Sequence, residues 1–210
     1  MNILIPIEIS SRELSYKIYL SHLLALKGFK CYLGYKSIIW HLTEKMQGYI
    51  YFDKGYHKGI SDKIYDSVKK NKGVIISLEE EGAVDYPDNQ TLLTRYSRNL
   101  FSAADLVFLW GIHQSNYFND RFAEDKKVVV SGHPRFQLLK EKYHLLYQDE
   151  VDALKSEYGE FILISLNMGY GNNIMGDDYI LDEYGRWFDN IQSIVDFDKK
   201  KFDTFISLAK

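Results

Sequence analysis

Segments that resemble buried β-strands alternate with segments of helical periodicity along this chain, and this alternation limits the possible folds more than any other feature. The first apolar segment, 2–9, is rich in isoleucine, as is typical of a strand buried on both faces of a parallel sheet. Parallel strands are joined by crossover connections that are usually helical. We therefore predict an α/β fold with a Rossmann-like, doubly wound parallel sheet. The predicted strands are 2–9, 30–34, 49–52, 74–78, 106–110, 127–131 and 161–167.

The helical signal is clearest after the first strand. Ser10 and Glu13 form an S-x-x-E capping box, and apolar residues then recur at helical spacing from Tyr16 to Leu24. These features predict a helix that begins with Ser10 as its cap. Further helices are predicted at 61–70, 92–100, 112–122 and 137–159 and near the end of the chain.

The order of the predicted elements suggests two domains. We predict a Rossmann-like N-terminal domain at 1–140, a helical connection at 141–158 and the start of a second Rossmann-like domain at 159–210. The second domain is expected to be incomplete, because its single predicted strand is followed only by a Gly/Asn-rich loop and one amphipathic helix. Chemistry in the first domain is then expected to need a missing C-terminal domain or a partner chain.

Composition excludes several classes of function. The net charge is −3 and no basic stripe alternates with aromatic residues, so no nucleic-acid partner is predicted. No signal peptide and no apolar run of roughly 18 residues is present, which predicts a cytoplasmic protein. The lone Cys31 is expected to be a small core residue. The run Lys199 to Lys201 is read as a solvated helix face or, alternatively, a peripheral contact with the inner membrane.

Polar residues follow most of the predicted strands. In an open α/β sheet ligands bind beyond the carboxyl ends of the strands, so these residues are the candidates for a substrate site. They are Glu8 and Arg12, Lys36, Glu79 to Gly82, Gly111, His133 and Arg135, and Asn167 and Asn172.

The three adjacent carboxylates Glu79, Glu80 and Glu81 are the sharpest of these features. Crowding or burial would raise the pKa of at least one of them, which suits a general base that takes a proton from a hydroxyl. Gly82 would let the backbone turn closely beside them. The alternative is an exposed acidic turn. A metal site is not predicted, since adjacent residues of an extended chain point to opposite faces.

The segment from Gly132 to Arg135 is the second feature. A glycine turn followed by His133 and Arg135 could hold a phosphate or carboxylate, or it could be a tight turn whose arginine pairs with an acid. The sequence has no G-x-G-x-x-G after its first strand, no P-loop and no G-x-S-x-G elbow. We therefore predict no dinucleotide cofactor and no serine hydrolase chemistry.

Several of these segments together resemble the bacterial surface carbohydrate biosynthesis proteins, which are glycosyltransferase-like chains. The similarity runs in order along essentially the whole chain. The segments are PIEISSREL at 6–14, YFDKG at 51–55, SLEEEG at 77–82, LVFLWG at 106–111, SGHPRFQLL at 131–139 and FILISLNMGYGNN at 161–173.

The resemblance implies the GT-B architecture, in which two Rossmann-like domains face each other across the active site. Related transferases that use CMP-sugars share a D/E-D/E-G motif, which Glu80-Glu81-Gly82 resembles, so Glu80 is the first candidate for the base and Glu81 the second. His133-Pro134 is similar to their H-P motif but follows the last strand of the first domain. The usual R-P-H-P segment would lie beyond the final helix, so we expect no transfer by this chain alone.

The sequence thus predicts a glycosyltransferase, or its N-terminal half, that moves a sugar from a nucleotide donor, here CMP-linked, to a glycan acceptor of the cell surface. Glu8, Arg12 and Arg135 are expected to line its cleft. Two alternatives stay open. One is another enzyme of the same architecture, a CDP-glycerol-type phosphotransferase or a UDP-sugar epimerase. The other is a truncated module that binds a glycan or a partner protein without catalysis.

Overall fold

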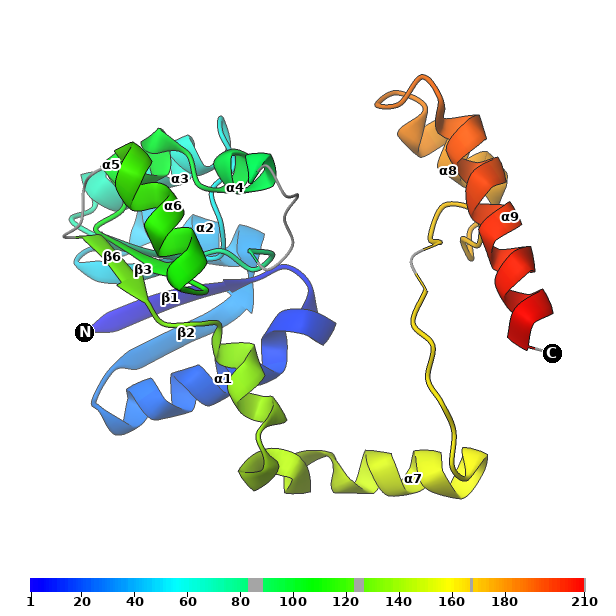
Figure 1. Ribbon diagram of the computed structural model, residues 1–210. Coiled ribbons are helices and arrows are strands. Elements are labelled where there is room, and N and C mark those ends of the chain that lie inside the picture. The colour runs from blue at the N-terminus through cyan, green and yellow to red at the C-terminus, as the bar shows by residue number, and fades with distance from the viewer. Residues whose placement is uncertain (83–88, 123–126, 167, 210) are drawn as a thin grey trace. The chain divides into compact units, whose positions relative to one another are not determined.

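The computed structural model describes residues 1–82, 89–122, 127–166 and 168–209. Its centre is a six-stranded, all-parallel sheet with the strand order β2-β1-β3-β4-β5-β6 (Figure 1). The predicted α/β, doubly wound Rossmann-like fold is therefore confirmed. The strands are β1 (Asn2–Ile7), β2 (Lys30–Tyr35), β3 (Tyr49–Asp53), β4 (Val74–Leu78), β5 (Leu106–Leu109) and β6 (Val128–Val130).

Helices cover both faces of this sheet (Figure 1). On one face Leu20 and Leu24 of α1 pack against Ile3 and Ile5 of β1. On the other face lie α2 to α6, whose apolar residues share a second core with the remaining sheet residues. The helices are α1 (Ser10–Leu26), α2 (Lys36–Lys45), α3 (Ser61–Lys70), α4 (Gln90–Arg95), α5 (Arg98–Ala103) and α6 (Ile112–Phe122).

Alternation along the strands explains why the sheet is buried on both sides. In β1, Ile3 and Ile5 face the α1 layer whereas Leu4 faces the opposite core. In β3, Tyr51 and Phe52 divide in the same way. Successive side chains of a strand point to opposite faces, so an uninterrupted apolar strand fits only a sheet with two covered faces.

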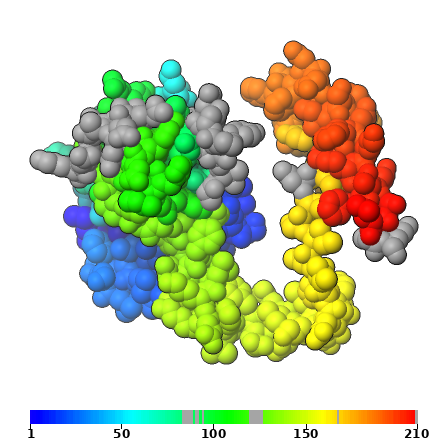
Figure 2. Space-filling view, viewed as in Figure 1, coloured from blue at the N-terminus to red at the C-terminus, as the bar shows by residue number. Residues whose placement is uncertain are grey.

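The seventh predicted strand, Phe161–Asn167, is not formed over 161–166, and Asn167 lies outside the described residues. The stretch is extended, with Ile162 and Leu163 exposed by 90% and 81%. In Figure 2 it is the yellow single-chain stretch that follows α7 (Gln148–Tyr158). A strand needs a hydrogen-bonded neighbour, and the described residues of this part of the chain offer none. The apolar pattern alone was therefore not sufficient to predict a strand.

Of the capping box predicted for the first helix, the Ser10 part is wrong and the Glu13 part is present. Ile9, not Ser10, is the N-cap, and it makes no side-chain cap bond. The Glu13 half is present, because its carboxylate accepts the backbone N–H groups of Glu8 and Ile9 at 3.1 and 3.2 Å. An acidic group is favoured at this position because the N–H groups of the first turn have no partner inside the helix.

Two compact units make up the chain, Met1–Asp149 and Glu150–Lys210. The first contains the sheet, its helices and two 3₁₀ segments, η2 (Pro134–Leu139) and η3 (Glu141–Tyr147). In the second, α8 (Asp177–Tyr184) and α9 (Ile191–Ala209) pack around Ile180, Ile191 and Val195. Cations of the predicted lysine run pair within this unit, Lys199 with Asp177 and Lys201 with Asp198. No helix in the described parts of the chain is both long and apolar enough to cross a bilayer.

Candidate functional site at the carboxyl edge of the sheet

The strand order places a crevice between β1 and β3. The chain runs from β1 outward to β2 and then returns to the other side of β1, where β3 to β6 follow in sequence. The connections on the two sides of β1 leave in opposite directions, so a space opens above the carboxyl ends of β1 and β3. Glu8 directly follows β1, Lys36 begins α2 after β2, and Asp53 ends β3.

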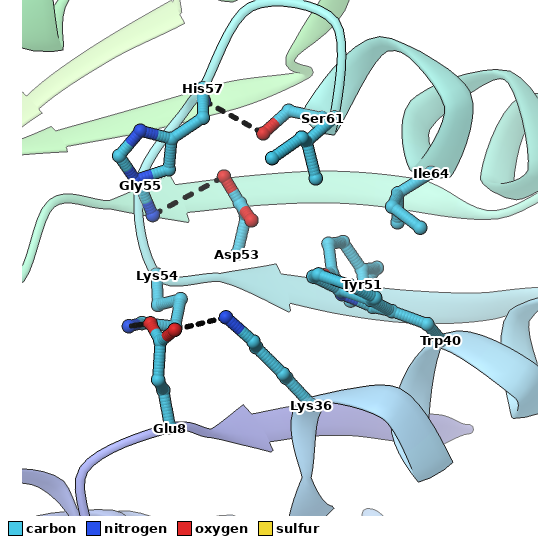
Figure 3. A pocket seen from close by; sticks show the side chains of 11 residues that line it. Glu8, Lys36, Trp40, Tyr51, Asp53, Lys54, Gly55, His57, Ser61 and Ile64 are labelled. Atoms are coloured by element: carbon cyan, nitrogen blue, oxygen red, sulfur yellow. Dashed lines mark hydrogen bonds and ion pairs between the residues drawn. The ribbon is translucent and has the colours of Figure 1, made fainter. Parts of the chain in front are cut away.

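A cavity of about 250 Å³ occupies this place, and we call it the switch-point pocket (Figure 3). One side of the pocket is polar and is formed by Glu8 with its ion-pair partners Lys36 and Lys54. These ion pairs lower the pKa of Glu8. At the other end Trp40 and Tyr51 lie side by side, with the indole N–H donating to the Tyr51 hydroxyl at 3.0 Å. The pocket thus has an aromatic wall and a charged wall, a combination that suits a sugar or another polar ring.

Asp53 is one of the residues that line this pocket, and it is only 4% exposed. Burial raises its pKa to about 6, although the hydrogen bond from the Tyr65 hydroxyl at 2.6 Å acts against that rise. The Gly55 backbone N–H reaches the same carboxylate oxygen at 3.4 Å. A buried acid near neutrality is characteristic of functional sites, because burial disfavours its charged form.

A second cavity of about 320 Å³ shares Glu8, Lys54 and His57 with the first, and we call it the carboxylate pocket. The predicted glutamate cluster lines it together with Arg12 and Arg95. Because three residues are common to both cavities, the two pockets adjoin along the ends of β1, β3 and β4. They form one site of two parts.

Glu79 is the member of the cluster whose charge is least stabilised. Burial raises its pKa to about 7, in spite of Arg95, whose Nη1 lies 3.2 Å from Oε1. A Cβ atom at Gly55 would collide with the Glu79 carboxylate, so only glycine fits there while the carboxylate keeps this position. Gly55 also has φ +139°, a conformation that favours glycine. The loop after β3 therefore positions Glu79.

Glu80 is in a different environment although it is the next residue. Its Oε1 accepts the Tyr16 hydroxyl and lies 3.0 Å from Lys17 Nζ. Its Oε2 lies 3.2 Å from His133 Nε2, and these two buried atoms have no other partner among the described residues. Burial would raise the pKa of Glu80, but His133, Lys17 and Tyr16 together lower it. A carboxylate this well paired is a weak proton acceptor.

The tautomer of His133 follows from its second ring nitrogen. Nδ1 accepts the Arg135 backbone N–H at 3.3 Å, so the ring proton lies on Nε2 and faces Glu80. The imidazole is 4% exposed and packs on Trp110 at 4.7 Å. Gly132, with φ +72°, makes the left-handed turn that brings it there from β6. His133 therefore joins the end of β6 to the end of β4.

Glu81 is the exposed member of the cluster. It pairs with Arg12 Nη1 at 2.7 Å and with Arg95 Nη1 at 3.0 Å, and these bonds lower its pKa. Gly82 is buried, and a Cβ atom there would come within 3.0 Å of Trp110 and Tyr96. Packing of these two side chains therefore leaves little room for a side chain at Gly82.

Sequence reasoning missed the cationic and acidic residues beneath the cluster. Lys17 is fully buried, bonds Glu13 at 2.8 Å and the Pro6 carbonyl at 2.8 Å, and faces Glu80. Burial would raise the pKa of Glu13, but Lys17 and its other partners lower it to about 2. Spacing i, i+4 of Glu13 and Lys17 was the available signal, but such pairs are common on exposed helix faces. Lys54 directly follows β3, so the rule that ligands bind beyond the carboxyl ends of the strands also applies to it.

The structure brings most of the predicted site residues to this one edge. Glu8, Arg12, Lys36 and the glutamate cluster line the two adjoining pockets. Gly111 follows β5 but contributes to neither lining, and Asn172 belongs to the second unit. Asn167 lies outside the described residues. In the described parts of the chain no cluster of His, Cys, Asp and Glu has the arrangement of a metal site.

Comparisons with known proteins do not assign the chain to a family. A scan of protein-family models, a search of curated proteins and a search of solved structures each found no match.

Proposed function

We propose that this chain is the acceptor-side domain of a glycosyltransferase that builds bacterial surface polysaccharide. Its donor would be a nucleotide sugar, CMP-linked, its acceptor a glycan, and its place of action the cytoplasm. The reaction class is supported chiefly by Glu79, a buried carboxylate in a polar pocket with a pKa of about 7. General bases work best when their pKa lies close to the working pH.

In the proposed reaction Glu79 takes the proton of an acceptor hydroxyl. The hydroxyl oxygen bonds to the anomeric carbon of the donor, the bond from that carbon to the phosphate oxygen breaks, and the nucleotide leaves with the electron pair. Arg95 would hold Glu79 in place by its contact at 3.2 Å. The switch-point pocket would hold the acceptor ring against Trp40, next to the Glu8 ion pairs.

Glu80, the first candidate by resemblance, would in this proposal hold the pocket together. Its three partners come from α1 and from the segment after β6, so it links elements that surround the site. Glu81 would position Arg12 and Arg95 at the rim.

The test is an activity assay with the full-length product of the gene. Sugars activated with CMP, CDP and UDP are offered with surface-glycan acceptors, and nucleotide release and sugar transfer are measured. We expect Glu79→Gln to lower kcat by about 10²- to 10⁴-fold, the usual contribution of a general base. The matched control is Glu44→Gln, an exposed glutamate on α2 outside both pockets, which should retain full activity.

The dependence on pH gives a second readout. Glu79 must be ionised to accept a proton, so kcat/KM should rise with pH up to about 7 and then level off.

A Glu79→Gln enzyme with normal turnover beside an inactive Glu80→Gln enzyme would move the base to Glu80. Transfer of glycerol phosphate from CDP-glycerol, or interconversion of UDP-sugars, would replace the proposed reaction. Glycan binding without turnover of any donor would support the non-catalytic alternative.

A further inference from the structure

A third cavity, of about 310 Å³, lies between the start of α1 and η2, and we call it the basic pocket. It shares only Arg12 with the carboxylate pocket. No acidic residue is present among its described lining residues, which distinguishes it from the other two cavities. The residues that line the basic pocket are Ser11, Arg12, Ser15, Tyr16, Arg135, Phe136, Leu138, Leu139 and Tyr147.

Arg135 lines this pocket and has no counterion among the residues that the structure describes. Its guanidinium carbon lies 5.1 Å from the Trp110 ring centre and 5.4 Å from that of Phe136. Its backbone is fixed by the bond to His133 Nδ1. In the part of the chain that the structure describes, no carboxylate lies within 4.0 Å of this guanidinium. Stacking keeps the planar fork in one orientation and leaves its N–H donors available.

Arg12 adds a second guanidinium at the boundary of the pocket. Its Nη1 is bound to Glu81 at 2.7 Å and its Nη2 lies 3.5 Å from Glu13, whereas its Nε is buried and has no acceptor among the described residues. Arg12 is thus paired with two carboxylates, and the group that favours an anion is the guanidinium of Arg135, which has no carboxylate partner among the described residues and whose planar geometry matches phosphate.

The rest of the lining is hydroxyl on one side and apolar on the other. Ser11 and Ser15 are one turn apart on α1 and both are exposed, so their hydroxyls can donate to an oxygen anion. Phe136 and Leu139 of η2 form the apolar side and are exposed by 48% and 65%. A free phosphate ion would leave this apolar surface in water.

Beyond the pocket the same character continues along η3. Leu145 and Leu146 are exposed by 84% and 66%, and the exposed Lys140 and Lys142 precede them. Exposed leucines beside lysines are typical of surfaces that lie at the boundary between lipid head groups and acyl chains.

We propose that the basic pocket binds the phosphate group of a lipid. The Arg135 fork and the two serine hydroxyls hold the phosphate oxygens, and Phe136 and Leu139 contact the first methylene groups. This proposal rests on the basic pocket alone and requires neither the transfer reaction nor Glu79 as its base.

The experiment is co-sedimentation of the full chain with phosphatidylcholine vesicles that either contain or lack phosphatidic acid. We expect binding only with phosphatidic acid. Arg135→Leu should weaken it by about 10- to 100-fold, the usual value of a charged hydrogen bond. Arg98→Leu is the matched control, since Arg98 is an exposed arginine of α5 outside the pocket. Ser15→Glu places a negative charge on an exposed position of α1 and should abolish binding without disturbing the fold.

Inorganic phosphate distinguishes the two sources of the anion. It should compete only weakly, because it lacks the apolar part. Equal binding of inorganic phosphate and of phosphatidic acid vesicles would overturn the lipid assignment. If Arg135→Leu and Arg98→Leu weakened vesicle binding equally, or if Ser15→Glu left binding unchanged, the vesicles would be attracted by general surface charge. Either result would overturn the basic pocket as the binding site. Absence of vesicle binding would overturn the proposal as a whole, whatever the activity assay finds.

Discussion

Three consecutive glutamates reach three different electrostatic states because each side chain has its own neighbours. Glu79 is buried with one arginine at its side, and its pKa rises to about 7. Glu80 is equally hidden, but a lysine, a histidine and a tyrosine lower its pKa. Glu81 is half-exposed between two arginines, which also lower its pKa. A carboxylate's chemistry is thus decided by the groups within a few ångströms of it.

The raised pKa values of Glu79 and Asp53 predict a pH dependence of stability. Both acids bind protons more tightly in the folded chain than in the unfolded chain. The folded state therefore carries more protons between the unfolded and folded pKa values, and their contribution to stability falls as pH rises from about 4 to about 7. Glutamine at position 79 has no proton to lose. The free energy of unfolding of Glu79→Gln should therefore increase relative to that of the native chain as pH rises over this range.

Urea unfolding between about pH 5 and about pH 8 measures this effect. Between the lower and the upper pH, we expect the free energy of unfolding of Glu79→Gln to increase relative to that of the native chain by on the order of 1–3 kcal/mol. Glu44→Gln serves again as the control, because Glu44 is well exposed on α2. If the free energies of unfolding of the native chain and Glu79→Gln changed with pH in parallel, the fold would not raise the pKa of Glu79, and the prediction would be contradicted.

At the scale of elements, α1 has two functions. Its Leu20 and Leu24 cover the sheet, and its first two turns carry Arg12, Glu13 and Lys17 to the carboxyl edge. Glu13 and Lys17 lie on one side of the helix, because residues four positions apart are neighbours there, and Arg12 directly precedes Glu13 in the first turn. The same helix therefore supports the core and the site.

Lys17 is the residue of α1 whose loss should be most damaging. Lys17→Met replaces the lysine by an unbranched apolar side chain that is one atom shorter, and it leaves Glu13 and Glu80 buried without their shared cation. Removing one partner of a buried ion pair typically costs about 3–5 kcal/mol, so we expect a loss of that order in the free energy of unfolding. The measurement is urea unfolding at neutral pH, with the exposed Lys27→Met as control. Equal stabilities of the two variants would contradict a structural role for the buried lysine.

At the scale of the molecule, the two units differ in what holds them together. The unit Met1–Asp149 contains the sheet and two extensive cores. The unit Glu150–Lys210 has a small core around Ile180, Ile191 and Val195, and its apolar segment 161–166 is largely exposed. A unit with so little buried apolar surface is expected to be marginally stable alone.

This difference predicts two unfolding transitions. The chain should lose the helical signal of the second unit first and that of the sheet-containing unit at higher temperature. A chain that ends at Asp149 should keep the upper transition within a few degrees. Calorimetry of both chains tests this. A truncated chain that no longer unfolds cooperatively would mean that the second unit stabilises the first.

Much of the sheet was predictable because its signal is local and repeated. The six strands of the sheet lie within two residues of their predicted ends, since apolar runs with turns on either side determine where a strand can form. The segment 161–167 carries the same signal, but over 161–166 no strand forms. Pairing is not local, and a strand exists only where a neighbour supplies its hydrogen bonds.

The sequence by itself determined the class of fold, the position of the polar residues at strand ends and the presence of three adjacent carboxylates. Only the tertiary structure decided which carboxylate is paired and which is not. Glu80 meets Tyr16, Lys17 and His133, which lie more than fifty residues away along the chain, whereas Glu79 meets Gly55 and Arg95. The pKa of a side chain depends on burial and on charges that the fold brings close, and neither can be read from its neighbours in sequence.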